Sequence, residues 1–167
     1  MKSIHGRRLG AGLALATALL ATAATAAEPS LAGTWTLTAA DRLAPDGSRS
    51  RDYGQHPKGR LIIDAQGRYS LQIFNGERLR VASGDKATST PEEFASAVMG
   101  SSTHYGTVAV DPAAHVLVFR IEGASYPNWE GTEQRRKYVL TADSLSYQVP
   151  APRPDGSVPI SAWRRER

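Results

Sequence analysis

Polar and apolar residues alternate along several short segments of the chain, which is the pattern of β-strands with one buried face. The clearest case runs from Arg68 to Phe74, where Tyr69, Leu71 and Ile73 share one face. The same pattern, read between turn residues, predicts strands at Thr34–Ala39, Gly59–Ala65, Arg68–Phe74, Glu77–Ala82, Thr103–Val110, His115–Glu122, Thr132–Thr141, Ser144–Val149 and Val158–Arg165.

Turn residues separate these segments roughly every ten to fifteen residues, which favours a sandwich or a barrel over alternating β–α–β units. Asn75-Gly76 is the strongest hairpin signal and predicts that Glu77–Ala82 returns as a strand. A loop rich in Asp, Gly, Ser and Arg is expected from Ala40 to Pro57. One candidate strand is short enough to merge with a neighbour, so we expect an all-β fold of about eight or nine antiparallel strands.

One segment breaks the β pattern. Thr90 is suited to be a helix N-cap, Pro91 to be the first helical residue, and Glu93 to complete a capping box. Phe94 and Val98 form an apolar stripe. The sequence therefore predicts one short helix that ends near Gly100 and packs over a barrel mouth or against its side.

The first 27 residues have the organisation of a secretory signal peptide. Lys2, Arg7 and Arg8 precede an apolar stretch, and Ala24-Thr25-Ala26 is an A-x-A cleavage site. Cleavage is expected before Ala27 or before Glu28. The apolar run is shorter than the roughly 20 residues of a spanning helix. We therefore expect a signal peptide over 1–27, a barrel domain over 28–167, a periplasmic or secreted location, and no membrane span after cleavage.

Removing this leader changes the charge balance. The whole chain has 20 Lys and Arg against 16 Asp and Glu, and the leader holds three of the basic residues, which leaves 17 against 16, a net charge of +1. The longest basic run, Arg135-Arg136-Lys137, lies in a predicted strand, where alternate residues face opposite ways. We expect no nucleic-acid partner. Without any cysteine, disulfides and thiol catalysis are excluded.

Several motifs together resemble one family. Leu31-Ala32-Gly33-Thr34-Trp35, Gly67-Arg68-Tyr69-Ser70, Tyr105-Gly106-Thr107, Pro127-Asn128-Trp129-Glu130-Gly131-Thr132 and Trp163-Arg164 look like the bacterial and fungal lipocalin-like domain family. The resemblance covers essentially the whole mature chain. It implies a calycin-type β-barrel and no single agreed activity, because a fold does not by itself determine function.

Lipocalin-type barrels close one end with a Gly-x-Trp at the first strand and an Arg in the last strand. Here Gly33 would let the backbone pass under the barrel floor and the indole of Trp35 would fill that floor. The Arg164 guanidinium would then lie across the indole as a cation–π contact. An eight-stranded barrel closed in this way has room for one small ligand.

The strand that begins at Thr132 places Gln134, Arg136 and Tyr138 on one face, which we interpret as the inner one. Arg136 and Gln134 would orient a carboxylate or carbonyl group of a ligand. The structural alternative is that Arg136 forms a buried ion pair with Glu122 or Glu130.

Aromatic and apolar residues would complete the ligand site. Trp129 lies on a loop and would either cover a ligand or anchor the loop on the barrel rim. Among the predicted inner residues, Tyr69, Tyr138 and Tyr147 are the polar ones. The inner lining is expected to be Tyr69, Leu71, Ile73, Leu117, Phe119, Ile121, Tyr138, Leu145 and Tyr147, and the ligand contacts Tyr69, Ile73, Phe119, Trp129, Gln134, Arg136 and Tyr138.

An acid–base site is the competing hypothesis. His104 shares its face with Gly106, Val108 and Val110, and would act with Glu122 or Tyr69 if these face it inside a cavity. A hydrogen-bonded structural histidine is the alternative. Serine-nucleophile, phosphate-loop and metal-ligand motifs are absent from the mature sequence, so we expect no metal and no cofactor.

Three functions are compatible with these observations. The first is an exported barrel that binds a small, hydrophobic or amphipathic molecule. The second is a barrel enzyme of the isomerase, cyclase or hydratase type, which would use His104 and Glu122. The third is an envelope protein whose barrel is filled by its own side chains. The sequence leaves the oligomeric state open.

Overall fold

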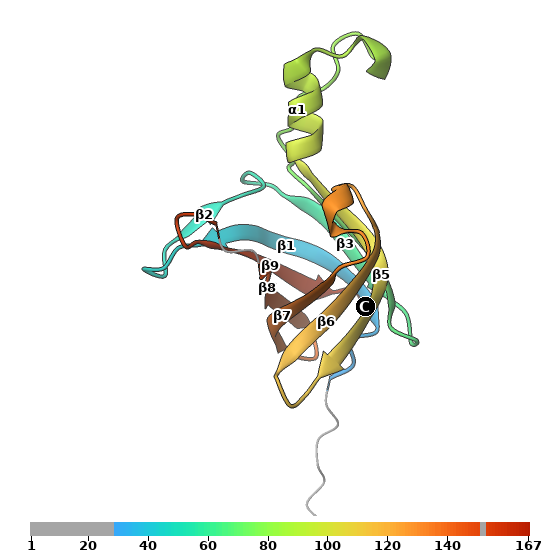
Figure 1. Cartoon of the computed structure of the whole chain (residues 1–167), viewed down its shortest axis with the longest axis vertical. Coiled ribbons are helices and arrows are strands. Elements are labelled where there is room, and N and C mark those ends of the chain that lie inside the picture. Colours follow the sequence, from blue (N-terminus) through green and yellow to red (C-terminus); the bar gives the residue numbers. More distant parts are fainter. Residues whose placement is uncertain (1–28, 151–152) are drawn as a thin grey trace, which may run out of the picture.

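A computed structural model describes residues 29–150 and 153–167, and these fold as a closed antiparallel β-barrel (Figure 1). The predicted signal peptide, residues 1–27, lies outside the described residues. The elements are β1 (Gly33–Leu43), β2 (Arg49–Arg51), β3 (Lys58–Ile63), β4 (Arg68–Phe74), the 3₁₀ helix η1 (Lys86–Thr88), α1 (Pro91–Met99), β5 (Ser101–Asp111), β6 (Val116–Ala124), the 3₁₀ helix η2 (Pro127–Trp129), β7 (Glu133–Leu140), β8 (Ser144–Gln148) and β9 (Val158–Arg165).

The barrel closes because β1 pairs with strands on both sides. Neighbouring strands follow the order β1-β3-β4-β5-β6-β7-β8-β9, and β9 pairs again with β1. A register shift between Leu37 and Ala39 bends β1 so that it can serve both partners. The three-residue strand β2 pairs with the end of β1 as an extra strand. The predicted antiparallel barrel with eight to nine strands is thus confirmed.

The closed end of the barrel is built around Trp35, which is completely buried. Its indole N–H donates to the Leu31 carbonyl at 3.0 Å, and the Arg165 guanidinium carbon lies 4.0 Å from the centre of its ring. Gly33 has a φ of 144°, and a Cβ at this position would come within 2.7 Å of the Arg165 side chain. Glycine is therefore needed here both for the backbone conformation and for the approach of the guanidinium.

The prediction that Arg164 covers the indole is wrong, because Arg165 does so. Trp163 is buried, and residues two apart on a strand share a face, so Arg165 points to the same side as Trp163. Arg164 points outward and is exposed. Arg165 also donates hydrogen bonds to the carbonyl oxygens of Ala32 and Ala142, at 2.7 and 2.6 Å, and so ties the two chain ends of the domain together.

The predicted strand Glu77–Ala82 is absent, and Asn75-Gly76 does not form a hairpin. After β4 the chain leaves the barrel, and the N–H of Asn75 donates to the Gly100 carbonyl at 2.8 Å. The backbone N–H groups of Leu79 and Ala82 donate to side chains of α1 instead of to a neighbouring strand. Hydrogen bonds to α1 therefore determine the course of this segment, despite the hairpin preference of Asn75-Gly76. In contrast, β2 and the last four residues of β1 lie within the segment Ala40–Pro57, which was expected to be a loop.

The predicted helix is confirmed as α1, including the capping box between Thr90 and Glu93. Its expected packing against the barrel is wrong, because no residue of α1 is buried. Phe94 and Val98 are 48% and 64% exposed, and α1 extends away from the strands in Figure 1. The described residues contain no helix that is long and apolar enough to cross a membrane.

The hydrophobic core consists of side chains that point into the barrel, including Trp35 at the closed end. Eight of the nine residues predicted to line the interior are buried, and Tyr138 is partly buried and packs against them. The core cluster consists of Trp35, Leu37, Ala40, Leu61, Ile63, Tyr69, Leu71, Ile73, Val108, Leu117, Phe119, Leu145, Tyr147 and Trp163.

The two C-terminal arginines provide a matched test of the closed end. Arg165→Ala removes the cation–π contact and its hydrogen bonds, and we expect it to lower the free energy of unfolding by about 1–2 kcal/mol. Arg164→Ala changes an exposed side chain and should stay within about 0.5 kcal/mol of the unsubstituted protein. Urea unfolding measures both, and equal losses would contradict the assignment of Arg165 as the residue that covers Trp35.

Candidate functional site

The end of the barrel opposite Trp35, which we call the mouth, is open. Two adjoining hollows of about 260 and 750 Å³ lie there and share Asp52, Tyr53, Trp129 and Arg153 as lining residues. The smaller hollow is lined by residues at the upper ends of β1, β4 and β9, among them Ile73 and Ser161, and by Val149 just after β8. The larger one is bordered by Val98 and Met99 at the end of α1. The interior therefore opens to solvent at this end.

Below the mouth, the Arg136 guanidinium lies inside the barrel. Residues of β7 alternate between exposed and inward positions, and Arg136 is only 3% exposed. Its guanidinium carbon lies 4.1 Å from the ring centre of Phe119 and 5.0 Å from that of Tyr147. Burial lowers the pKa of Arg136, but an arginine side chain stays protonated in proteins. The barrel thus encloses a positive charge that lies against two neighbouring aromatic rings.

Arg136 has polar neighbours but no acidic partner among residues 29–150 and 153–167. Its Nη2 donates to Gln134 Oε1 at 2.8 Å and to His104 Nε2 at 3.2 Å. The alternative of an ion pair with Glu122 or Glu130 is wrong: Glu122 is exposed, and Glu130 accepts a hydrogen bond from the Ala124 backbone. The Nε atom of Arg136 is buried and has no hydrogen-bond partner in the described part of the chain.

His104 links Arg136 to Tyr69. It is 4% exposed, and its Nδ1 lies 2.7 Å from Tyr69 Oη. Because a guanidinium can only donate, Nε2 of His104 must accept, and the ring proton must be on Nδ1, from which it is donated to Tyr69. Burial, and secondly the charge of Arg136, lower the pKa of His104 to about 3. Burial also raises the pKa of Tyr69. The imidazole is therefore neutral at physiological pH.

These features disfavour the acid–base hypothesis, although His104 and Tyr69 do lie within hydrogen-bond reach of each other. A general acid or base works best when its pKa is close to the working pH, and both pKa values are shifted away from neutrality. Glu122, the proposed partner of His104, is exposed on the outer side of β6. Val110 is also exposed, so the inner face of β5 does not extend that far. His104 instead orients hydrogen bonds.

The remaining predicted ligand contacts occupy different depths. Trp129 lies at the mouth, where its ring packs edge-on against His104 at a centroid distance of 6.0 Å. Ile73 lines the smaller hollow, and the ring of Phe119 lies against the Arg136 guanidinium. Tyr138 lies two residues further along β7 and stacks on His115 at 4.7 Å. The structure therefore brings Tyr69, Phe119, Gln134 and Arg136 together, and Tyr138 lies apart from them.

Two inward residues next to Tyr147 escaped the sequence analysis as site residues. Trp163 was interpreted only as part of the barrel end, and Ser161 was not singled out. Both are buried, and Ser161 lines the smaller hollow. Their alternation along β9 was a usable signal for burial, but their position next to Tyr147 depends on the pairing of β8 with β9.

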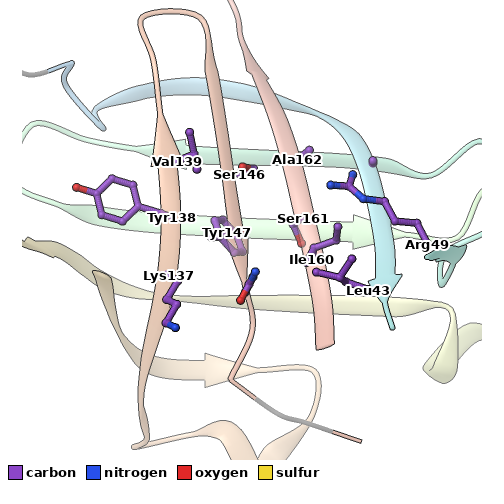
Figure 2. A pocket seen from close by; sticks show the side chains of 12 residues that line it. Leu43, Arg49, Lys137, Tyr138, Val139, Ser146, Tyr147, Ile160, Ser161 and Ala162 are labelled. Carbon is purple, nitrogen blue, oxygen red and sulfur yellow. The ribbon is translucent and has the colours of Figure 1, made fainter. Parts of the chain in front are cut away.

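A further hollow of about 250 Å³ lies on the outer surface of β1, β7, β8 and β9 (Figure 2). Lys137 and Val139 border it, and they alternate with the inward residues of β7. Arg49 flanks the opposite side (Figure 2). We call this the outer hollow.

The comparison with protein-family models agrees with this architecture. A family model described as a lipocalin-like domain matches residues 32–165. No curated protein matches the chain. Among solved structures, the crystal structure of a mutant of the fluorescent protein UnaG is 14% identical in sequence and covers 81% of this chain and 95% of its own, with a TM-score of 0.35. This similarity is too low to support an argument.

The neutral state of His104 predicts a pH dependence of stability. The pKa of a histidine in the unfolded chain is about 6.5, so below that pH the unfolded state takes up a proton that the folded state, with a pKa of about 3, does not. Stability from this group is therefore complete above pH 6.5 and is lost as the pH falls towards 3. Between pH 7 and pH 5 we expect a loss of about 2 kcal/mol from His104.

Urea unfolding at the two pH values measures this loss. His104→Gln, which can still accept from Arg136 and donate to Tyr69, should remove it, whereas His56→Gln in an exposed loop should retain it. An unchanged pH slope in His104→Gln would show that the imidazole is not held neutral.

Proposed function

The chain belongs to the lipocalin-like domain family, and from this premise we propose that it binds, inside its barrel, a small and largely apolar molecule that carries an acidic or carbonyl group. One observation carries the proposal: the guanidinium of Arg136 is buried without a carboxylate partner in the described part of the chain. An unpaired buried charge is unfavourable by several kcal/mol, so its presence is best explained by a ligand that supplies the opposite charge.

The arrangement around Arg136 supports this role. Gln134 and His104 hold Nη2, and the rings of Phe119 and Tyr147 hold the guanidinium plane, so its position is fixed before a ligand arrives. Preorganisation of this kind reduces the entropy lost on binding. The smaller hollow at the mouth gives a path from solvent, and Trp129 on its border can pack against an apolar ligand.

The site is better suited to binding than to acid–base catalysis. The ring proton of His104 is donated to Tyr69 in a hydrogen bond. Burial moves the pKa values of His104 and Tyr69 away from neutrality in opposite directions, so neither residue is suited to exchange a proton near pH 7. A barrel filled only by its own side chains is the remaining alternative, and the hollow that leads from the mouth towards Ser161 argues against it. We further propose export to the periplasm or beyond, on the basis of the leader sequence.

Native mass spectrometry of the protein purified from its own host tests the proposal. We expect a co-purified small molecule with an acidic or carbonyl group on the unsubstituted protein. Arg136→Met should lose this molecule, because Met keeps the apolar stem and removes the charge. Arg135→Met is the matched control, since the neighbouring Arg135 points outward and pairs with Asp111.

The outcome that contradicts the proposal is also specific. If Arg136→Met retains the molecule, or binds it with unchanged affinity while becoming more stable, Arg136 is a structural residue and the ligand contacts lie elsewhere.

A further inference from the structure

Three buried polar atoms inside the barrel have no hydrogen-bond partner within residues 29–150 and 153–167. They are Arg136 Nε on β7, Tyr147 Oη on β8 and Trp163 Nε1 on β9. The three residues are 3%, 2% and 1% exposed, and they come from three consecutive strands. Buried polar groups are nearly always paired in folded proteins, so three orphans in one place require an explanation.

The three side chains are neighbours. The Arg136 guanidinium carbon lies 5.0 Å from the ring centre of Tyr147, and the rings of Tyr147 and Trp163 stack with centroids 6.4 Å apart. The Tyr147 hydroxyl lies near the polar atoms of Trp163, Ser161 and Arg136, which partly offset the rise that burial causes in its pKa. None of these contacts is aligned as a hydrogen bond for the hydroxyl.

All three atoms can act as donors. A guanidinium N–H and an indole N–H can only donate, and a phenol donates its own proton. Nη2 of Arg136 donates to Gln134 and His104, and these contacts leave Nε without a partner in the described part of the chain. A cluster of donors around a positive charge is complementary to a negatively charged oxygen.

We propose that Arg136, Tyr147 and Trp163 form a head-group site for a carboxylate, and that the ligand enters the barrel with this head group first. The inference rests on the proposed function and names the chemical class of its ligand: an aliphatic or aromatic monocarboxylate.

The path from the mouth fits this orientation. Ser161 lines the smaller hollow and pairs with Tyr147 across β8 and β9, so it lies between this hollow and the donor cluster. Tyr147 and Ser161 also border the outer hollow. Ile73, Val149 and Trp129 provide apolar walls further out, where the tail of the ligand would lie.

The charged groups at the mouth are compatible with an anion. Asp41 and Asp52 border the smaller hollow, and both are paired: Asp52 with Arg42 and Arg153, and Asp41 with Arg51. These arginines offset the repulsion that the two carboxylates would otherwise exert on an anionic head group.

Three amphiphiles of equal chain length test the head group: decanoate, 1-decanol and decylammonium, titrated into the purified protein by calorimetry. We expect decanoate to bind at least about tenfold more tightly than 1-decanol, which is the effect of a single charge-assisted hydrogen bond, and decylammonium to bind least.

Nuclear magnetic resonance of the indole N–H groups locates the bound head group in the unsubstituted protein. The Trp163 signal should shift strongly with decanoate and weakly with 1-decanol. The Trp35 indole already donates to the Leu31 carbonyl and serves as the internal control, which should not shift.

Conservative variants then separate the donors. Trp163→Phe and Tyr147→Phe should each weaken decanoate binding by about tenfold and leave 1-decanol binding unchanged. Lys137→Met, at the border of the outer hollow in Figure 2, should leave decanoate binding unchanged. If either core variant fails to fold, the indole signals of the unsubstituted protein still decide the question.

The outcomes distinguish the two proposals. Equal affinity for decanoate and 1-decanol with an unmoved Trp163 signal overturns the head-group site and leaves binding in the barrel standing. Loss of decanoate binding in Lys137→Met places the ligand in the outer hollow and also overturns the site. No binding of any of the three amphiphiles counts against both the head-group site and the proposed function.

Discussion

The pairing of β9 with β1 is the constraint on which the rest of the structure depends. It converts an open sheet with two free edges into a closed barrel, and each strand then has one face directed into a shared interior. Every second residue of β7, β8 and β9 is enclosed for that reason, whether it is apolar or charged. The burial of Arg136 is thus a result of closure, and the aromatic rings that stack on its guanidinium make that burial tolerable.

The sequence was most informative where one local rule decides the outcome. Alternation was sufficient to predict β4, β6, β7 and β8, and the capping box at Thr90 was sufficient to predict α1. The failures have a common cause. Glu77–Ala82 has strand-like residues, but its backbone is bonded by helix side chains that lie 11 to 17 residues away in sequence. The motif pointed to Arg164. However, residues two apart on a strand share a face, so Arg165 and not Arg164 lies on the inner side with the buried Trp163.

In the site too, local patterns predict which residues point inward, whereas contacts between strands decide which of them meet. Alternation along β7 was enough to place Arg136 and Gln134 inside the barrel. The partnership of His104 with Tyr69 depends on the register of β4 against β5, where Leu71 lies opposite His104. The approach of Tyr147 to Arg136 on one side and to Trp163 on the other depends on the pairing of three strands. The distances between these side chains depend on how all the strands pair in the closed sheet, so they cannot be predicted from any single segment of the sequence.

The excursion from Asn75 to Gly100 has a consequence for how this protein can change over evolutionary time. Its helix buries no residue, and the barrel strands on either side of it, β4 and β5, pair directly with each other. Substitutions and length changes in the excursion therefore act on the border of the mouth and have little effect on the folded core. Selection can reshape the rim in this segment without disturbing the packed strands that hold the buried charge.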